Sequence, residues 1–265
     1  MNLKSFRKQI LNHDKKYRRD FPWRRTHDPY RIMVSEIMLQ QTQADRVVEK
    51  YQQFIAKFPT VQKLAAAKLK TVLTVWQGLG YNRRAKMLHD AARLIVKEHQ
   101  GVVPRDTIKL EALPGIGPYT ARAIATFAFN QPHIFIETNI RSVFIHEFFP
   151  KKKLVSDAVL LPLIEQTLDQ KNPRAWYTAL MDYGAMLKKT KVNPSRKSKH
   201  YVRQSAFKGS DREVRGAIIK LLTVKKYTEA TLVKTLPFAS TRVKHNLNKL
   251  VAEQLVKKRN HSYTI

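Results

Sequence analysis

Apolar residues recur along most of the first 190 residues at the spacing of short amphipathic helices. Between Arg31 and Phe58 they fall three or four positions apart, which is the spacing of one helix face. The same spacing predicts further helices over residues 60–76 (two short ones), 82–100, 106–113, 120–130, 155–169 and 174–187. Alternating β-branched residues are scarce, so this part of the chain is predicted to be all-α.

A second periodic segment begins at Ser210. Ser210 and Glu213 have the spacing of a capping box, which predicts a helix from this point. Two more helices are predicted over 228–236 and 240–254, and residues 255–265 can form two short strands around Asn260 and His261. Three helices followed by a hairpin resemble a winged-helix module, whose third helix would turn polar residues outward: Arg242, Lys244, His245 and Lys249. Such modules dock on DNA or on proteins, and the charge of the chain favours DNA.

The two periodic segments are separated by a basic stretch. Residues 188–208 contain eight Lys or Arg side chains among Asn, Pro and Ser, with almost no apolar periodicity: Lys188, Lys189, Lys191, Arg196, Lys197, Lys199, Arg203 and Lys208. This composition is typical of a loop, and we predict a basic linker over 191–209. It is either a solvated tether or a strap that contacts phosphates.

The charge of the chain points to a polyanionic partner. Fifty Lys and Arg against twenty Asp and Glu leave a formal charge of +30, which is the composition of nucleic-acid-binding proteins. A membrane surface is also anionic, but the chain has no apolar run long enough to span or anchor in one. A ribosomal or packaging protein would be basic too, although 265 residues with 43% apolar content can bury a sizeable core.

The chain contains no cysteine. Disulfides, thiolate catalysis and cysteine-ligated zinc or iron–sulfur sites are therefore excluded. The first residues are polar and charged, so no secretory signal is expected. We expect a cytoplasmic, nucleoid-associated protein.

Glycines frame the most informative motif, Leu113–Ala121. Gly115 and Gly117 bracket one apolar residue immediately before a predicted helix. Glycine lets a backbone approach a phosphate closely, and the free N–H groups of the following helix then face the anion. Glu137 follows this DNA anchor and is a candidate carboxylate for chemistry on the nucleotide held there.

A second carboxylate lies in apolar surroundings. Glu36 sits between Val34, Ile37 and Met38 at the start of a predicted helix. Such surroundings raise the pKa of a carboxyl group, which suits a general acid or base. The alternative is that Glu36 forms a cap or a salt bridge with a neighbour such as Arg31.

Four segments occur together in an order that resembles one known family: 35–43 (SEIMLQQTQ), 76–81 (WQGLGY), 113–121 (LPGIGPYTA) and 181–186 (MDYGAM). They are similar to the adenine DNA glycosylase (MutY-like) branch of the helix-hairpin-helix DNA glycosylase superfamily, over about residues 5–190. The resemblance implies a two-lobed, all-α glycosylase domain over 1–190. Its lobes would be roughly 24–131 and 1–23 plus 132–190, with the winged-helix-like module at 210–265.

The resemblance also implies roles for individual residues. Glu36 matches the glutamate that protonates the adenine ring, and Asn139 matches the asparagine beside the catalytic aspartate. Tyr119 stands where bifunctional relatives have a lysine, so no Schiff base and no strand cleavage are expected. Gln40 and Gln41 match residues that contact the opposite strand, and Tyr81 matches the aromatic wedge that intercalates when the target nucleotide is extruded. The hairpin residues expected to grip DNA are Pro114, Gly115, Ile116, Gly117 and Thr120.

Three features depart from the family pattern. Glu137 replaces the aspartate that stabilises the oxocarbenium-like sugar, and its extra methylene can displace the carboxylate. The backbone is withdrawn to compensate, or the substrate differs, or catalysis is weakened; we favour the first two together. The family's four-cysteine iron–sulfur cluster is absent, so no cofactor is expected. The winged-helix-like module replaces a Nudix-like domain that reads 8-oxoguanine, which puts that recognition in question.

Together these features predict a monofunctional DNA glycosylase of base excision repair. We expect it to hydrolyse the N-glycosidic bond of a flipped, mispaired base in duplex DNA, with adenine opposite guanine or 8-oxoguanine first. Thymine or uracil opposite guanine is the alternative substrate, and a non-catalytic mismatch-sensing protein is the alternative class. A monomer is expected, with no metal apart from a monovalent cation that the carbonyls of 113–118 can hold, as in relatives.

Overall fold

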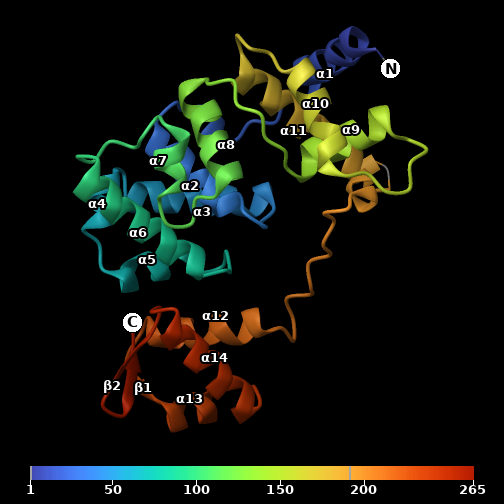
Figure 1. Cartoon of the computed structure of the whole chain (residues 1–265). Helices are drawn as coiled ribbons and strands as arrows, with labels where there is room; N and C mark the ends of the chain where they lie inside the picture. The colour runs from blue at the N-terminus through green and yellow to red at the C-terminus, as the bar shows by residue number, and fades with distance from the viewer. Residues whose placement is uncertain (1, 191) are drawn as a thin grey trace. The chain divides into compact units, whose positions relative to one another are not determined.

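The computed structural model describes residues 2–190 and 192–265, and it is mostly helical (Figure 1). The elements up to residue 190 are α1 (Leu3–Tyr17), a 3-10 turn at Pro22–Arg24, α2 (Pro29–Leu39), α3 (Ala44–Lys57), α4 (Val61–Ala65), α5 (Leu69–Trp76), α6 (Arg83–Glu98), α7 (Thr107–Glu111), α8 (Pro118–Phe129), α9 (Thr138–Phe148), α10 (Asp157–Thr167) and α11 (Pro173–Thr190). The predicted fold class is confirmed. No described helix is long and apolar enough to cross a membrane.

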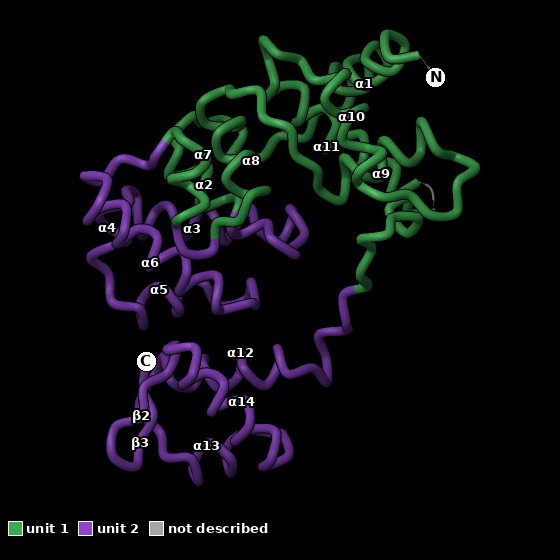
Figure 2. Tube along the Cα trace, viewed as in Figure 1, with its two compact units in different colours: residues 1–36, 105–112, 116–203 green, residues 37–104, 113–115, 204–265 purple. Residues whose placement is uncertain are grey.

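The chain forms two compact units, coloured separately in Figure 2. Unit 1 contains residues 1–36, 105–112 and 116–203, and unit 2 contains residues 37–104, 113–115 and 204–265. The boundary crosses α2 immediately after Glu36. The predicted domain boundaries at 190 and 210 stay a prediction.

Unit 1 is built around α11, which packs against α9 and α1. Its core contains a cluster of aromatic rings in which Phe6 of α1 contacts Phe144, Phe148 and Trp176, with ring centroids 5.0–6.0 Å apart. At the far side of α11, Asp182 is buried and binds two arginines of the segment before α2. Arg19 Nε lies 2.6 Å from Asp182 Oδ1, and Arg24 donates two hydrogen bonds of 2.8 Å. These ion pairs fix the segment that leads into α2.

Unit 2 includes α3 to α6, whose core is formed by Phe54, Leu64, Leu73, Trp76 and Leu88, all fully buried. The indole of Trp76 packs edge-on against Phe54 and donates to Gly80 O at 3.0 Å. This hydrogen bond closes the turn that presents Tyr81 at the start of α6.

The C-terminal module of unit 2 contains α12 (Asp211–Leu222), β1 (Tyr227–Thr228), α13 (Glu229–Thr235), α14 (Ser240–Ala252), β2 (Lys257–Arg259) and β3 (Ser262–Thr264). The strands form an antiparallel sheet in the order β1-β3-β2, with Tyr227 opposite Tyr263. The terminal hairpin was predicted; the short strand β1 was not. On α14, Lys244, His245 and Lys249 are exposed as predicted, whereas Arg242 is half-buried and binds Asp211.

Several local predictions need correction. The span 31–58 holds two helices, because the chain leaves helical geometry at Gln41, which has a φ of +55°. Ser210 and Glu213 do not form a capping box: the Ser210 hydroxyl donates to Phe207 O, and Glu213 accepts from the N–H of Gly209. Helices α1 and α9 were not predicted.

Candidate active site

Glu36 lies in the third turn of α2 and is buried, with 8% of its surface exposed. Its neighbours in the helix, Val34 and Ile37, are also buried, so the carboxyl group is withdrawn from water. Burial, together with the nearby charge of Glu137, raises the pKa of Glu36 to about 8. Arg31 lies near Asp28 instead, at 3.9 Å, so the salt bridge considered for Glu36 is not observed. Glu36 therefore has the environment of a general acid that is protonated at neutral pH.

Glu137 caps the N-terminus of α9. Its Oε1 accepts the backbone N–H groups of Asn139 and Ile140 at 2.7 and 2.9 Å. Its Oε2 accepts the Asn139 side-chain amide at 3.1 Å. A carboxylate at this end of a helix is stabilised by the free N–H groups and by the helix dipole. The extra methylene of glutamate is accommodated by folding the side chain back over its own helix.

Tyr119 completes the acidic cluster, on the second residue of α8. Its ring packs edge-on against Phe135, with centroids 5.7 Å apart, and Phe135 in turn stacks on Tyr177 at 3.9 Å. Burial and the charges of Glu36 and Glu137 raise the pKa of the Tyr119 hydroxyl well above its usual value. The hydroxyl is therefore a neutral hydrogen-bonding group, and Tyr119 supplies no amine.

Gly184 explains why the fourth motif contains a glycine. It lies on α11 against Asn139, and a Cβ at this position would come within 2.4 Å of the Asn139 carbonyl oxygen. Any side chain would push α11 away from the start of α9, where Asn139 holds Glu137. The role of Gly184 is thus a close helix approach that positions the site, which sequence reasoning did not identify.

Lys188 was assigned to the basic stretch from the sequence, but the structure places it near Glu137. It lies in the last turn of α11 and is half-buried. Burial lowers the pKa of Lys188, and the negative charge of Glu137 opposes that shift. An ammonium group in this electrostatic relation to Glu137 offsets part of the negative charge of that carboxylate.

The basic stretch is folded over residues 193–198. Asn193 Oδ1 accepts the N–H and the hydroxyl of Ser195 at 3.1 and 2.8 Å, and Ser142 of α9 donates to the same oxygen at 3.4 Å. Ser195 and Ser198 are buried, and Ser198 pairs with Val155 in an isolated β-bridge. The part of the predicted linker at Pro194–Lys197 is therefore a 3-10 turn packed on α9, because these short polar side chains satisfy their own backbone.

The glycine hairpin adopts the geometry that its sequence predicts. Gly115 has a φ of +79°, and a Cβ there would lie 2.8 Å from Met87 Cβ, so only glycine fits. Gly117 is the exposed N-cap of α8, where a Cβ would meet nothing within 4 Å, and Pro118 occupies the first helical position. Ile116 and Thr120 are buried and Pro114 is half-buried. This open helix N-terminus leaves room for a phosphate.

Gln40, Gln41 and Tyr81 come together in unit 2, around Arg84. The buried Arg84 guanidinium donates to the carbonyl oxygens of Ile37 and Met38 at 2.9 Å each, and also to that of Gln40. Its Cζ lies 5.2 Å from the centroid of the Tyr81 ring. Burial lowers the pKa of Arg84 to about 10. Arg84 thus organises the end of α2, and neither composition nor spacing identifies it.

Gln40 also joins this group to the hairpin, since its Nε2 donates to Gly115 O at 3.4 Å. Gln41 and Tyr81 both have positive φ values, +55° and +49°, which are uncommon for residues other than glycine. Strained backbone of this kind is often found at functional sites.

Known proteins are similar in sequence to this region. Residues 34–160 match the HhH-GPD superfamily of base excision DNA repair proteins, and this span contains Glu36, the hairpin and Glu137. This part of the chain is similar to that superfamily. The matched span contains three of the four sequence motifs, 35–43, 76–81 and 113–121, and supports the resemblance found in them.

Three relatives illustrate the similarity. An adenine DNA glycosylase of Mycolicibacterium smegmatis is 49% identical over 127 residues, which are 48% of this chain and 43% of the relative. The human adenine DNA glycosylase is 38% identical over 194 residues, 68% of this chain and 35% of the relative. The chain thus spans less than half the length of these two relatives. The solved structure of a thermostable thymine-DNA glycosylase is 29% identical with a TM-score of 0.61, over 69% of this chain and 86% of that one.

The family's iron–sulfur cluster does not fit this chain. Its ligands are thiolates, and the chain has no cysteine. The region after α11 instead forms the serine-rich turn described above.

Proposed function

We propose that this chain is a monofunctional DNA glycosylase that hydrolyses the N-glycosidic bond of a mispaired base in duplex DNA. Adenine opposite guanine or 8-oxoguanine is the first-choice substrate, in line with the relatives that are named adenine DNA glycosylases. The observation that carries the proposal is the pair of carboxylates in unit 1. Glu36 is buried with a pKa of about 8, and Glu137 is held by three N–H groups at the start of α9.

The mechanism divides the work between these two groups. Protonated Glu36 donates its proton to a ring nitrogen of the extruded base, so that the base leaves as a neutral species. Positive charge then develops at the sugar, and the fixed Glu137 carboxylate stabilises it. Because Glu137 is held before the reaction begins, little reorganisation is needed in the transition state. Water completes the hydrolysis at the anomeric carbon.

Because of Tyr119, we do not expect the site to cleave the DNA strand. A strand-cleaving glycosylase uses an amine to attack the sugar and form a Schiff base. A neutral phenol at this position cannot form one, so we expect an intact abasic strand as the product.

DNA would be held by the hairpin and the basic surface. The open N-terminus of α8 at Gly117 can approach a phosphate, and the charge of +30 attracts the duplex over a wide area. We propose that double-stranded DNA with a mispaired base is the partner, that the protein acts as a monomer in the cytoplasm, and that it needs no cofactor.

A second substrate class has its own support. The chain covers 86% of the thymine-DNA glycosylase structure but only 43% of the adenine DNA glycosylase of Mycolicibacterium smegmatis. Thymine or uracil opposite guanine is therefore the second candidate.

A mismatch panel tests the proposal. Duplexes with adenine opposite guanine, 8-oxoguanine or cytosine, and with thymine or uracil opposite guanine, are incubated with the full chain and then treated with alkali to break abasic sites. We expect alkali-dependent cleavage at the mispaired base. Cleavage without alkali would contradict the monofunctional assignment, and no base release from any duplex would overturn the enzyme assignment.

A further inference from the structure

The Tyr81 hydroxyl is bound by two side chains from the far end of the sequence. Gln204 Nε2 lies 2.5 Å from the Tyr81 hydroxyl oxygen, and Arg212 Nη1 lies 2.8 Å from it. The Arg212 guanidinium carbon is also 5.1 Å from the centroid of the Tyr81 ring, within the range of a cation–π contact. All of these residues belong to unit 2.

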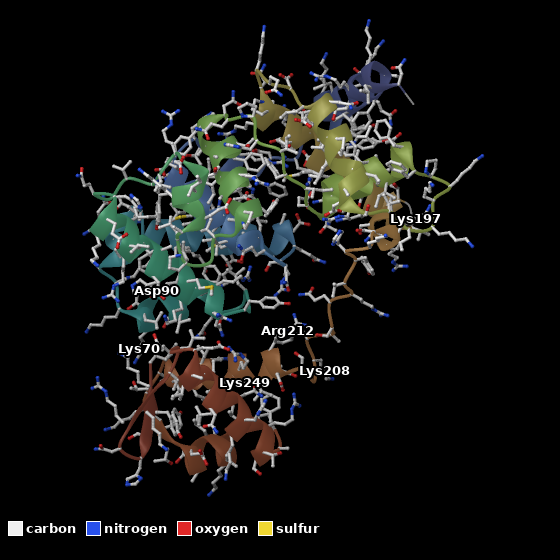
Figure 3. All side chains as sticks on the ribbon, viewed as in Figure 1. Lys70, Asp90, Lys197, Lys208, Arg212 and Lys249 are labelled. Carbon is white, nitrogen blue, oxygen red and sulfur yellow. The ribbon has the colours of Figure 1, made fainter. Side chains whose placement is uncertain are left out.

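Arg212 is itself held in place. It lies at the start of α12 and is labelled in Figure 3. Its Nη2 donates to Ser205 O at 2.6 Å, to the Ser205 hydroxyl at 3.2 Å and to Ala206 O at 3.3 Å. The guanidinium therefore reaches Tyr81 from a fixed position rather than as a free surface side chain.

A second guanidinium group lies near the Tyr81 ring. The Arg84 guanidinium carbon lies 5.2 Å from the ring centroid, and Arg84 is fixed by the carbonyl groups at the end of α2. Gln204 additionally donates to Gln41 O at 3.5 Å. Tyr81 and Gln41, the two residues with strained backbone in this part of the site, are thus connected through one C-terminal side chain.

Further hydrogen bonds attach the module near the end of α12. Gln77 Nε2 donates to the Thr223 hydroxyl at 2.8 Å, and Lys70 Nζ donates to Val224 O at 3.2 Å. Contacts at both ends of α12 fix the direction of this helix along the segment from α5 to Tyr81. Arg212 therefore meets Tyr81 in a defined orientation.

We propose that Arg212 and Gln204 are positioning residues for Tyr81, and that the C-terminal module thereby sets how efficiently a base is extruded from duplex DNA. The inference rests on the proposed function, in which Tyr81 is the intercalating side chain. A ring that enters the base stack must hold its orientation, and immobilising it beforehand reduces the entropy lost on binding.

Extrusion can be measured without chemistry. The full chain carrying Glu36→Gln is bound to a duplex with 2-aminopurine beside the mispaired base, whose fluorescence rises when the neighbouring base leaves the stack. Adding Arg212→Ala should reduce the equilibrium constant for extrusion, obtained from the extruded fraction at saturating protein, about ten-fold, which corresponds to about 1.4 kcal/mol. Gln204→Ala should have a smaller effect in the same direction.

The matched control is Lys208→Ala. Lys208 is exposed and lies four residues before Arg212, so this variant removes an equal charge from the same region without a contact to Tyr81. It should leave the extruded fraction unchanged. Arg212→Lys should recover only part of the loss, because a single ammonium group cannot bind both Tyr81 and Ser205.

Combination with Tyr81→Ala separates positioning from direct DNA contact. If Arg212 acts through Tyr81, Arg212→Ala has no further effect once the ring is gone. An equal loss in the Tyr81→Ala background would show that Arg212 binds DNA itself and would overturn the inference. So would increased extrusion on Arg212→Ala, since that would mean the module restrains the wedge, and so would an unchanged extruded fraction on Arg212→Ala when Tyr81 is present.

Failure of the proposed function would look different. In that case the chain without any substitution releases no base from any mismatched duplex. A chain that releases bases but is indifferent to Arg212→Ala would leave the proposed function intact and remove only this inference.

Discussion

Glu36 and Glu137 are the same type of residue in one site, but their environments differ. Glu36 projects from the middle of α2 among buried apolar residues, and its pKa is raised to about 8. Glu137 precedes α9 and accepts two backbone N–H groups and a side-chain amide. Position within a helix therefore decides the chemistry: the interior of a buried helix favours the neutral acid, and a helix N-terminus favours the anion.

The two carboxyl groups also interact electrostatically. The charge of Glu137 helps to keep the proton on Glu36, since it is one of the two causes of the raised pKa. Two carboxylates with opposed environments are the usual arrangement when one acts as acid and the other stabilises positive charge.

The largest effect is expected from Glu36→Gln, which removes the proton donor and keeps the size of the side chain. General acid catalysis contributes about 10²–10⁴-fold, so single-turnover base excision should fall by that factor. Binding of the mismatched duplex should be unchanged, as measured by fluorescence anisotropy. Excision at the original rate would remove Glu36 from the mechanism.

The loss of single-turnover excision rate should be slightly smaller for Glu137→Gln. The amide keeps one oxygen for the N–H groups of α9 but loses the charge, and electrostatic stabilisation of this kind is worth about 10²–10³ in rate. Glu137→Asp is the matched variant, because it keeps the charge and restores the family's residue. Aspartate should retain most of the single-turnover rate; equal losses for both variants would show that side-chain length matters more than charge.

Gly184→Ala tests the packing that holds Glu137 in place. The new Cβ would meet the Asn139 backbone at 2.4 Å, so α11 or α9 must shift. Overpacking of this kind costs about 1–3 kcal/mol of stability. We expect a lower melting temperature and about ten-fold slower excision, whereas Gly216→Ala, where a Cβ meets nothing within 4 Å, should neither lower the melting temperature nor slow excision.

The last prediction concerns the pH dependence of stability. Between about pH 4.5 and pH 8 the unfolded carboxyl of Glu36 ionises while the folded one keeps its proton, so the stability of the original chain falls as pH rises. Each unit of pKa difference is worth about 1.4 kcal/mol. Glu36→Gln lacks this loss, so its melting temperature relative to the original chain should rise with pH and level off above about pH 8. A constant difference across this range would mean that the pKa of Glu36 is not raised.

Much of the helical framework was predictable because its signals are local. Helices α4, α5 and α6 have regular apolar spacing and lie close to their predicted bounds. Helix α9 was missed because its cap is Glu137, an unusual N-cap residue, and because it is apolar on several sides. Helix α1 was missed because its buried residues Phe6 and Ile10 stand among many lysines and arginines.

In the candidate site, too, residues with local signals were predictable and the others were not. Glu36 was predicted from its apolar neighbours together with the family resemblance of its motif, and the hairpin from the glycines that its backbone requires. Gly184, Lys188 and Arg84 act through residues far away in the sequence, so their roles depend on packing that no local pattern contains. The contact of Arg212 with Tyr81 joins positions 131 residues apart and became visible only in the folded chain.

The most direct test of the two-carboxylate account is the pH dependence of single-turnover excision, measured for the original chain and for Glu137→Gln. Activity should fall as pH rises through about 8, where Glu36 loses its proton. Removing the charge of Glu137 should move that fall to lower pH, because one cause of the raised pKa is gone. A rate that stays constant well above pH 8, or a fall that Glu137→Gln leaves in place, would contradict the account.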